Sequence, residues 1–207
     1  MSGDSGRRPI RTRSSLWAGS VGGWLARCGC SANALSVLGI GFAALAAFLL
    51  WSGAGPWALV GAALSIQLRL ICNLLDGLVA VEGGRGTKVG VLYNEFPDRI
   101  EDALILVAAG ASVGQERLGW ACAVLAVMTA QARSFTGCVG QAQDFGGPMA
   151  KQHRMAVVTL ACLTMAALTP WSTQTWPMEG GLWVVCLGSA LTWWLRLRRM
   201  ALGLEQG

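Results

Sequence analysis

The chain has 207 residues, of which 54% are hydrophobic and 13% are charged, and its mean hydropathy is +0.50. This composition is too apolar for a typical water-soluble domain and predicts one compact integral membrane domain. The formal net charge of +5 comes largely from arginines near the two ends. Beside membrane spans such arginines indicate topology and contacts with anionic lipid headgroups, so no nucleic-acid partner is expected.

The N-terminal part is predicted to lie outside the membrane bundle. Residues 1–13 carry four arginines among glycine, serine and proline, which is typical of a flexible basic arm. Residues 14–30 form an amphipathic pattern that is too short to cross a bilayer and suits a helix on the membrane surface. An ordinary soluble helix is the alternative.

Six apolar runs follow, and their lengths suit helices that cross a membrane. They cover residues 34–51, 57–81, 89–113, 118–139, 155–168 and 181–195. Basic residues gather at both ends and in the loops 82–88 and 140–154, so the positive-inside rule places the termini and these loops in the cytoplasm. The sequence therefore predicts an all-α protein of a bacterial inner membrane, with a six-helix transmembrane domain over residues 31–200 and a C-terminal tail over 201–207.

Polar residues gather in one stretch of this apolar chain. Asn73 and Asp76 share a helix face, and the next segment carries a stripe with four-residue spacing, formed by Gly90, Asn94, Asp98 and Asp102. An ionised carboxylate facing lipid is unfavourable, so two helices meeting along these faces are expected to enclose a polar pocket. The alternative, that the acids merely lie near helix ends, suits Asp76 but not a stripe about 18 Å long.

This set of side chains favours metal-assisted phosphoryl chemistry at the cytoplasmic face. Carboxylate and amide oxygens without His or Cys form a hard site of the kind that holds Mg²⁺, Mn²⁺ or Ca²⁺, and such cations bind phosphates. Gly77 and Gly90 would leave room for a substrate beside the backbone. Further contacts to phosphate oxygens are expected from Arg85, Lys88, Arg99, Lys151 and Arg154.

The same residues resemble the motif of the CDP-alcohol phosphotransferase family. That motif reads Asp-x-x-Asp-Gly-x-x-Ala-Arg, about eight residues, then Gly-x-x-x-Asp-x-x-x-Asp, on the second and third of six transmembrane helices. Here the pattern is Asn73-x-x-Asp76-Gly77-x-x-Ala80-Val81, eight residues, then Gly90-x-x-x-Asn94-x-x-x-Asp98. The chain therefore resembles a divergent member in which Asn replaces two of the four motif Asp residues and Val81 replaces the Arg.

The resemblance implies transfer of a phosphatidyl group from a CDP-linked lipid such as CDP-diacylglycerol to a small alcohol, with release of CMP, in phospholipid biosynthesis. It implies Asp98 as general base, Mg²⁺ or Mn²⁺ as cofactor, and a homodimer. The expected metal ligands are Asn73, Asp76, Asn94, Asp98 and Asp102. The expected substrate contacts are Gly77, Ala80, Arg85, Thr87, Lys88, Gly90, Arg133, Lys151 and Arg154.

Several alternatives stay open at this point. The two Asn residues remove two negative charges, which would leave one metal instead of two, or weak metal binding, unless another acid compensates. Asp102 is the preferred substitute because it lies one turn past Asp98, whereas Glu95 points about 100° away from Asn94. The acceptor is open among glycerol 3-phosphate, serine, inositol phosphate and other polar alcohols. The rival functions are a non-catalytic lipid- or nucleotide-binding protein and a membrane transporter.

Overall fold

The computed structural model describes residues 31–82, 90–169 and 174–205, with the side chains of residues 80–94 outside the described part. Regular structure in these ranges is entirely helical, as the apolar runs predict. The helices are α2 (Ala32–Ser52), α3 (Pro56–Glu82), α4 (Gly90–Ser112), α5 (Glu116–Cys138), α6 (Lys151–Leu168) and α7 (Trp176–Glu205). The predicted basic arm (1–13) and surface helix (14–30) lie outside the described residues.

Local signals set the boundary between the first two described helices. The hydroxyl of Ser31 accepts a hydrogen bond from the backbone N–H of Ala34 at 3.1 Å, which caps the start of α2. Gly53, with φ of 59°, ends the helix in the left-handed conformation that glycine adopts without strain. Pro56 then opens α3, where its missing N–H does not break a helical hydrogen bond. α2 and α3 therefore form a tight antiparallel pair.

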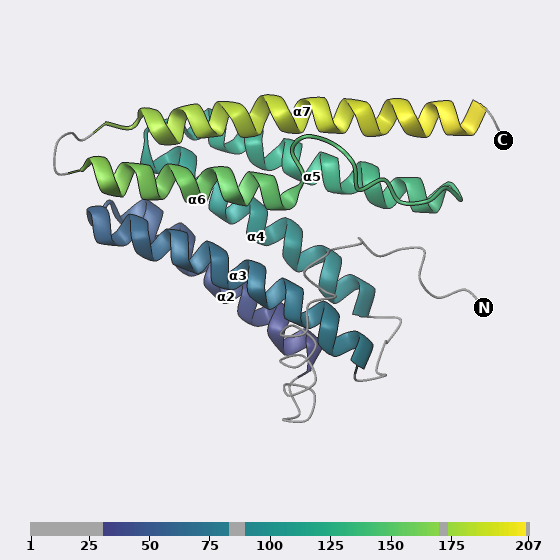
Figure 1. Ribbon diagram of the computed structural model, residues 1–207, viewed down its shortest axis with the longest axis horizontal. Helices are drawn as coiled ribbons and strands as arrows, with labels where there is room; N and C mark the ends of the chain where they lie inside the picture. The colour runs from purple at the N-terminus through teal and green to yellow at the C-terminus, as the bar shows by residue number, and fades with distance from the viewer. Residues whose placement is uncertain (1–30, 83–89, 170–173, 206–207) are drawn as a thin grey trace.

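The helices form two groups, which meet through α4 and through a direct contact between α3 and α6 (Figure 1). α2 and α3 lie side by side, α5, α6 and α7 pack together, and α4 runs between the two groups, in contact with α2 and α5. Glycines permit a close approach of α4 and α5, because a Cβ atom added to Gly110 would lie 2.6 Å from the Cα of Gly119. The arrangement places one face of α4 against α2 and α3 and another face toward α5 and α6.

Three of the described helices are long and apolar enough to cross a membrane. They are Ala32–Ser52, Pro56–Val79 and Trp176–Glu205, with mean hydropathies of 2.2, 1.7 and 1.2 in their most apolar windows. These helices support an integral membrane protein. α4 is less apolar because it carries the acidic residues of the central polar stretch, and the total of six membrane spans stays a prediction.

The last two helices are longer than the apolar runs that predict them. α6 begins at Lys151 rather than at residue 155, and α7 extends from Trp176 to Glu205 rather than from 181 to 195. Residues 201–205, expected in a C-terminal tail, are therefore helical. Arg, Leu, Met and Ala dominate the end of α7 and favour helix, so the helix continues past the point where its apolar run stops.

Candidate functional site

The polar faces of α3 and α4 meet, as the spacing predicts. The side-chain amide of Asn73 donates hydrogen bonds to Asp98 Oδ1 at 2.7 Å and to Glu101 Oε2 at 2.9 Å. Asp98 and Glu101 are three residues apart on α4, so both point toward α3. The contact between Asn73 and Asp98 therefore joins the polar stripe of α4 to the polar face of α3.

A buried network of charges lies beneath this contact. Arg69, whose side chain is 0% exposed, binds Glu101 through Nε and binds Asp102 Oδ1 through Nη2 at 2.5 Å. Arg154 Nη2 binds the other oxygen, Asp102 Oδ2, at 2.8 Å. Buried charges are tolerated when they are paired and hydrogen-bonded, so these four side chains neutralise one another. Both oxygens of Asp102 are held by arginines, an arrangement that differs from the metal-ligand role expected for it.

Asp98 lies next to this buried network, and its side chain is partly exposed to solvent. Its Oδ1 is paired with the ammonium group of Lys151 at the start of α6, and the two side chains are 26% and 22% exposed. The predicted base and a predicted substrate-contacting lysine are thus in direct contact. Asp98 is accessible enough to meet a substrate, whereas Asp102 is not.

Asp76 lies deeper, against α2. Its side chain is buried, and Oδ2 accepts a hydrogen bond from the Ser36 hydroxyl at 2.7 Å. Its Oδ1 has no hydrogen-bond partner within the described part of the chain, and the same holds for Oε1 of Glu101. Buried carboxylate oxygens are normally satisfied, so these two atoms mark a place where a cation or another donor would fit.

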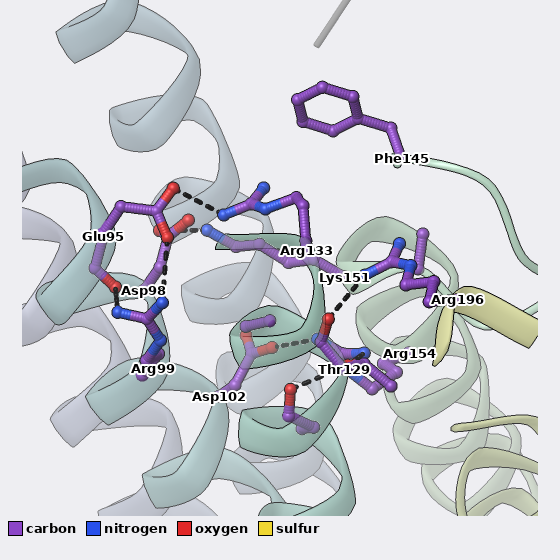
Figure 2. A pocket seen from close by; sticks show the side chains of 13 residues that line it. Glu95, Asp98, Arg99, Asp102, Thr129, Arg133, Phe145, Lys151, Arg154 and Arg196 are labelled. Atoms are coloured by element: carbon purple, nitrogen blue, oxygen red, sulfur yellow. Dashed lines mark hydrogen bonds and ion pairs between the residues drawn. The ribbon is translucent and has the colours of Figure 1, made fainter. Parts of the chain in front are cut away.

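A pocket opens on the side of α4 that faces α5 and α6 (Figure 2). Its lining contains five basic and three acidic side chains, an excess that favours an anionic ligand. Thr129, Phe145 and three alanines complete the wall. The lining residues are Glu95, Asp98, Arg99, Asp102, Ala126, Thr129, Ala130, Arg133, Phe145, Ala150, Lys151, Arg154 and Arg196. Arg133, Lys151 and Arg154 were predicted substrate contacts, and the structure brings all three to this pocket.

Glu95 organises the outer rim of the pocket. Its Oε1 binds Arg133 at 2.5 Å and its Oε2 binds Arg99 at 3.1 Å. The Arg133 guanidinium also lies 5.4 Å from the ring centre of Phe145, within cation–π range. Arg99 and Arg133 are thereby held beside Glu95 and near Asp98, and the ring of Phe145 lies farther away on the pocket wall (Figure 2).

The connector between α5 and α6 is bound to α7 and closes the pocket on one side. Arg196 donates to the carbonyl of Gly146 at 3.0 Å and to the carbonyl of Thr129 at 2.7 Å. The backbone N–H of Met149 donates to the Thr192 hydroxyl at 2.9 Å. The end of α7, which the sequence presents only as a basic topology signal, therefore contributes to the site.

Several of the predicted site residues lie wholly or partly outside the residues that the structure describes. Arg85, Thr87 and Lys88 are outside the described residues, and the side chains of Ala80 and Asn94 are also outside them. Gly77 is buried on α3, and Gly90 is the first residue of α4.

Site residues that sequence reasoning missed include Arg69, Glu101 and Phe145. Arg69 lies four residues before Asn73, and Glu101 three after Asp98, so helical spacing was the signal for both.

The donor set fits a hard cation only in part. Within the described residues, no group of three or more His, Cys, Asp or Glu side chains is close enough to hold a metal ion. Asn at positions 73 and 94 accounts for this, because an amide supplies an oxygen without a charge. The unpartnered oxygen of Asp76 and the side-chain oxygen of Asn73, on the same face of α3, are still of the kind that Mg²⁺ or Mn²⁺ binds.

Comparison with known proteins gives the same fold. No family model matches the chain. In sequence it is 25% identical over 158 residues to the inner membrane protein YnbA of Escherichia coli (strain K12). This alignment covers 72% of this chain and 74% of that protein. It is 23% identical over 184 residues to a phosphatidylinositol phosphate synthase of Mycobacteroides abscessus, which covers 81% of this chain and 76% of that enzyme.

Solved structures of the Mycobacterium tuberculosis phosphatidylinositol phosphate synthase superpose well. The structure with CDP-DAG bound has a TM-score of 0.76 at 20% identity and covers 90% of this chain and 94% of that one. The structure in complex with manganese and citrate has a TM-score of 0.75 at 20% identity and covers 88% of each. The chain therefore has this fold, and the sequence similarity supports the enzyme class of the CDP-alcohol phosphatidyltransferases.

Proposed function

We propose that this chain transfers the phosphatidyl group of a CDP-linked lipid, such as CDP-diacylglycerol, to a small alcohol and releases CMP. The observation that carries the proposal is the contact between Asn73 and Asp98, which joins the two motif halves beside a pocket rich in basic groups. The shared fold with an enzyme whose structure contains CDP-DAG supports the lipid substrate. By the positive-inside rule the reaction takes place on the cytoplasmic face.

Asp98 is the proposed general base. Asn73 and Lys151 both bind its Oδ1 and hold that oxygen in place. Oδ2 then accepts the proton of the acceptor hydroxyl as the alcohol oxygen forms a bond to the lipid-bearing phosphorus. The bond from that phosphorus to the CMP oxygen breaks, and CMP leaves with the electron pair. Holding one carboxylate oxygen fixes the direction of the other, which is what base catalysis requires.

Asn73, Asp76, Asn94 and Asp98 are the residues proposed to hold a divalent cation. Bound Mg²⁺ or Mn²⁺ would neutralise charge on the pyrophosphate and make CMP a better leaving group. Asp102 is assigned a different role, the pairing of Arg69 with Arg154. Arg85, Thr87 and Lys88 remain proposed phosphate contacts, and Gly77, Ala80 and Gly90 are proposed to let the nucleotide approach the backbone.

The acceptor is proposed to carry an anionic group as well as its hydroxyl. Arg133, Lys151 and Arg154 line the pocket on the side where the acceptor must reach Asp98, and Arg99 and Arg196 add to its positive charge. Arginine binds phosphate through paired N–H donors, so a phosphorylated polyol fits this wall better than a zwitterion such as serine.

CMP release from CDP-diacylglycerol by the purified chain tests the proposal. The acceptors are tested singly, with Mg²⁺, with Mn²⁺ and with a chelator, beside Asp98→Asn and the distant control Glu179→Gln, whose side chain is bonded by Thr175 at the start of α7. We expect metal-dependent release that Asp98→Asn abolishes and Glu179→Gln retains. CDP-lipid binding without release would favour a non-catalytic binding protein, and substrate flux across sealed vesicles would favour a transporter.

A further inference from the structure

Glu101 is the buried acid closest to the amide that replaces a motif carboxylate. It is 0% exposed, and its Oε2 accepts a hydrogen bond from the Asn73 amide at 2.9 Å and pairs with Arg69. Its other oxygen, Oε1, is buried and has no hydrogen-bond partner in the part of the chain that the structure describes. Leaving such an oxygen unsatisfied is unfavourable, so this atom points to a cation or a hydrogen-bond donor that binds there.

The absence of a side chain at Gly39 of α2 allows an oxygen of Glu101 and an oxygen of Asn73 to approach the same point. A Cβ atom added to Gly39 would lie 2.7 Å from Glu101 Oε1 and 3.1 Å from Asn73 Oδ1. Both oxygens therefore face the same point of α2, where a side chain is absent. Ser36, one turn earlier, binds Asp76 Oδ2 and leaves the buried Oδ1 of Asp76 unpartnered. Asp76 thus contributes a second unpartnered carboxylate oxygen, from the same helix face as Asn73.

Two other acids on α4, Asp102 and Glu95, have both carboxylate oxygens paired with arginines. Asp102 has an arginine on each oxygen, Arg69 on Oδ1 and Arg154 on Oδ2. Glu95 likewise has Arg133 on Oε1 and Arg99 on Oε2. Glu101 has an arginine on Oε2 alone. Of these three acids, it is the one with an oxygen directed at Asn73 and available to a cation.

We propose that Glu101 supplies the carboxylate that is absent at position 73, and that its Oε1 joins Asn73 Oδ1 and Asp76 in binding one divalent cation. Asn73 offers a neutral oxygen, and Glu101 adds the anionic one, a combination that suits Mg²⁺ or Mn²⁺. The identification of the cation as Mg²⁺ or Mn²⁺ rests on the proposed function. It assigns to the chain a ligand that lies outside the motif it shares with the CDP-alcohol phosphotransferases.

The assignment is tested by measuring how tightly Mn²⁺ binds to the purified full chain. Binding is measured as the decrease in the EPR signal of free Mn²⁺. Glu101→Gln should weaken binding by at least about tenfold. Asn73→Asp in the Glu101→Gln background should restore it, because the carboxylate returns to the motif position. Glu179→Gln, the same substitution in the first turn of α7, should bind as the unaltered chain does.

Glu101→Gln also removes a partner of Arg69, so a second pair of variants tests the site with the ion pair between Glu101 and Arg69 retained. Gly39→Ala would place a methyl group against Glu101 Oε1 and leave every charge in place, whereas a Cβ atom at Gly41 would meet nothing within 4 Å. We expect Gly39→Ala to weaken Mn²⁺ binding and Gly41→Ala to leave it unchanged.

The possible outcomes separate this inference from the proposed function. Unaltered Mn²⁺ affinity in folded Glu101→Gln, or a loss that Asn73→Asp does not restore, would overturn the inference and leave Glu101 as a partner of Arg69 only. CMP release without Glu101-dependent Mn²⁺ binding would likewise overturn the inference while the transferase stands. Glu101-dependent binding without CMP release from any acceptor would support the inference and count against the transferase.

Discussion

Lys151 and Asp98 form an ion pair between the start of α6 and the middle of α4, and both side chains remain partly exposed to the pocket. The pair connects the two groups of helices at the carboxylate proposed as the base. A lysine in this position holds one oxygen of Asp98 and adds positive charge to the pocket in which the proposed substrate would bind. Lys151 is therefore expected to matter more for the reaction than for stability.

Replacing Lys151 tests this expectation. Lys151→Met should lower kcat for CMP release by about 100-fold, the effect typical of losing one preorganised electrostatic contact. Lys151→Arg should keep part of the activity because it keeps the charge. The melting temperature should change little, since partly exposed ion pairs contribute little to stability. Full activity in Lys151→Met would exclude this role.

Replacing Arg69, unlike replacing Lys151, is expected to lower the stability of the protein strongly. Arg69→Met would leave Glu101 buried without its arginine and remove one of the two arginines from Asp102. Breaking a buried ion pair from one side costs about 3–5 kcal/mol. The free energy of unfolding in detergent should fall by that amount, whereas Arg199→Met, which removes an exposed pair with Asp144, should change it by less than about 1 kcal/mol. Equal stability of the two variants would contradict the description of the network.

Ser36 is expected to position Asp76. Its hydroxyl donates to Asp76 Oδ2 at 2.7 Å, so Ser36→Ala should weaken Mn²⁺ binding by about tenfold, as loss of a hydrogen bond to a metal ligand does. Ser65→Ala is a matched control, because Ser65 is equally buried and its hydroxyl donates to the carbonyl of Gly61 in its own helix. Ser36→Thr should retain binding, since it keeps the hydroxyl. If Ser36→Ala and Ser65→Ala bind Mn²⁺ alike, Ser36 does not position Asp76.

The helices and the meeting of α3 with α4 are predictable from sequence, because both follow from local patterns. Apolar runs mark the helices, and residues spaced by three or four share a face. Those patterns are sufficient to place Asn73 opposite Asp98. They do not mark where a helix stops once its apolar run ends, which is why α7 continues to Glu205.

The partners of each acid are not predictable in the same way. Asp102 and Glu101 lie one position apart on α4, and both reach the interior. Spacing favours Asp102 as the substitute ligand, but Arg154 comes from α6, far away in sequence, and occupies one of its oxygens. The docking of the α5–α6 connector on α7, through Arg196, likewise depends on packing between distant segments. Helical periodicity gives the face of a residue, and tertiary packing decides its partner.

Replacing Arg133 tests the proposal that the acceptor alcohol carries an anionic group. It lines the pocket, bound to Glu95 and lying over the ring of Phe145, and does not take part in the contact of Asn73 with Asp98. Arg133→Gln should raise the KM for a phosphorylated alcohol about tenfold or more, because a charge-assisted hydrogen bond is lost, and should leave the KM for CDP-diacylglycerol nearly unchanged.

Steady-state CMP release, with each substrate varied in turn, separates the two effects on KM. A neutral alcohol used as acceptor gives the control, because its KM should not respond to Arg133→Gln. Because Arg133 also holds Glu95, the variant Glu95→Gln must be measured beside it. Equal changes in both variants would assign the effect to the shape of the rim, and a change confined to Arg133→Gln would assign it to the anionic group of the acceptor. A rise in the KM for CDP-diacylglycerol alone would place the nucleotide, instead of the acceptor, at this end of the pocket.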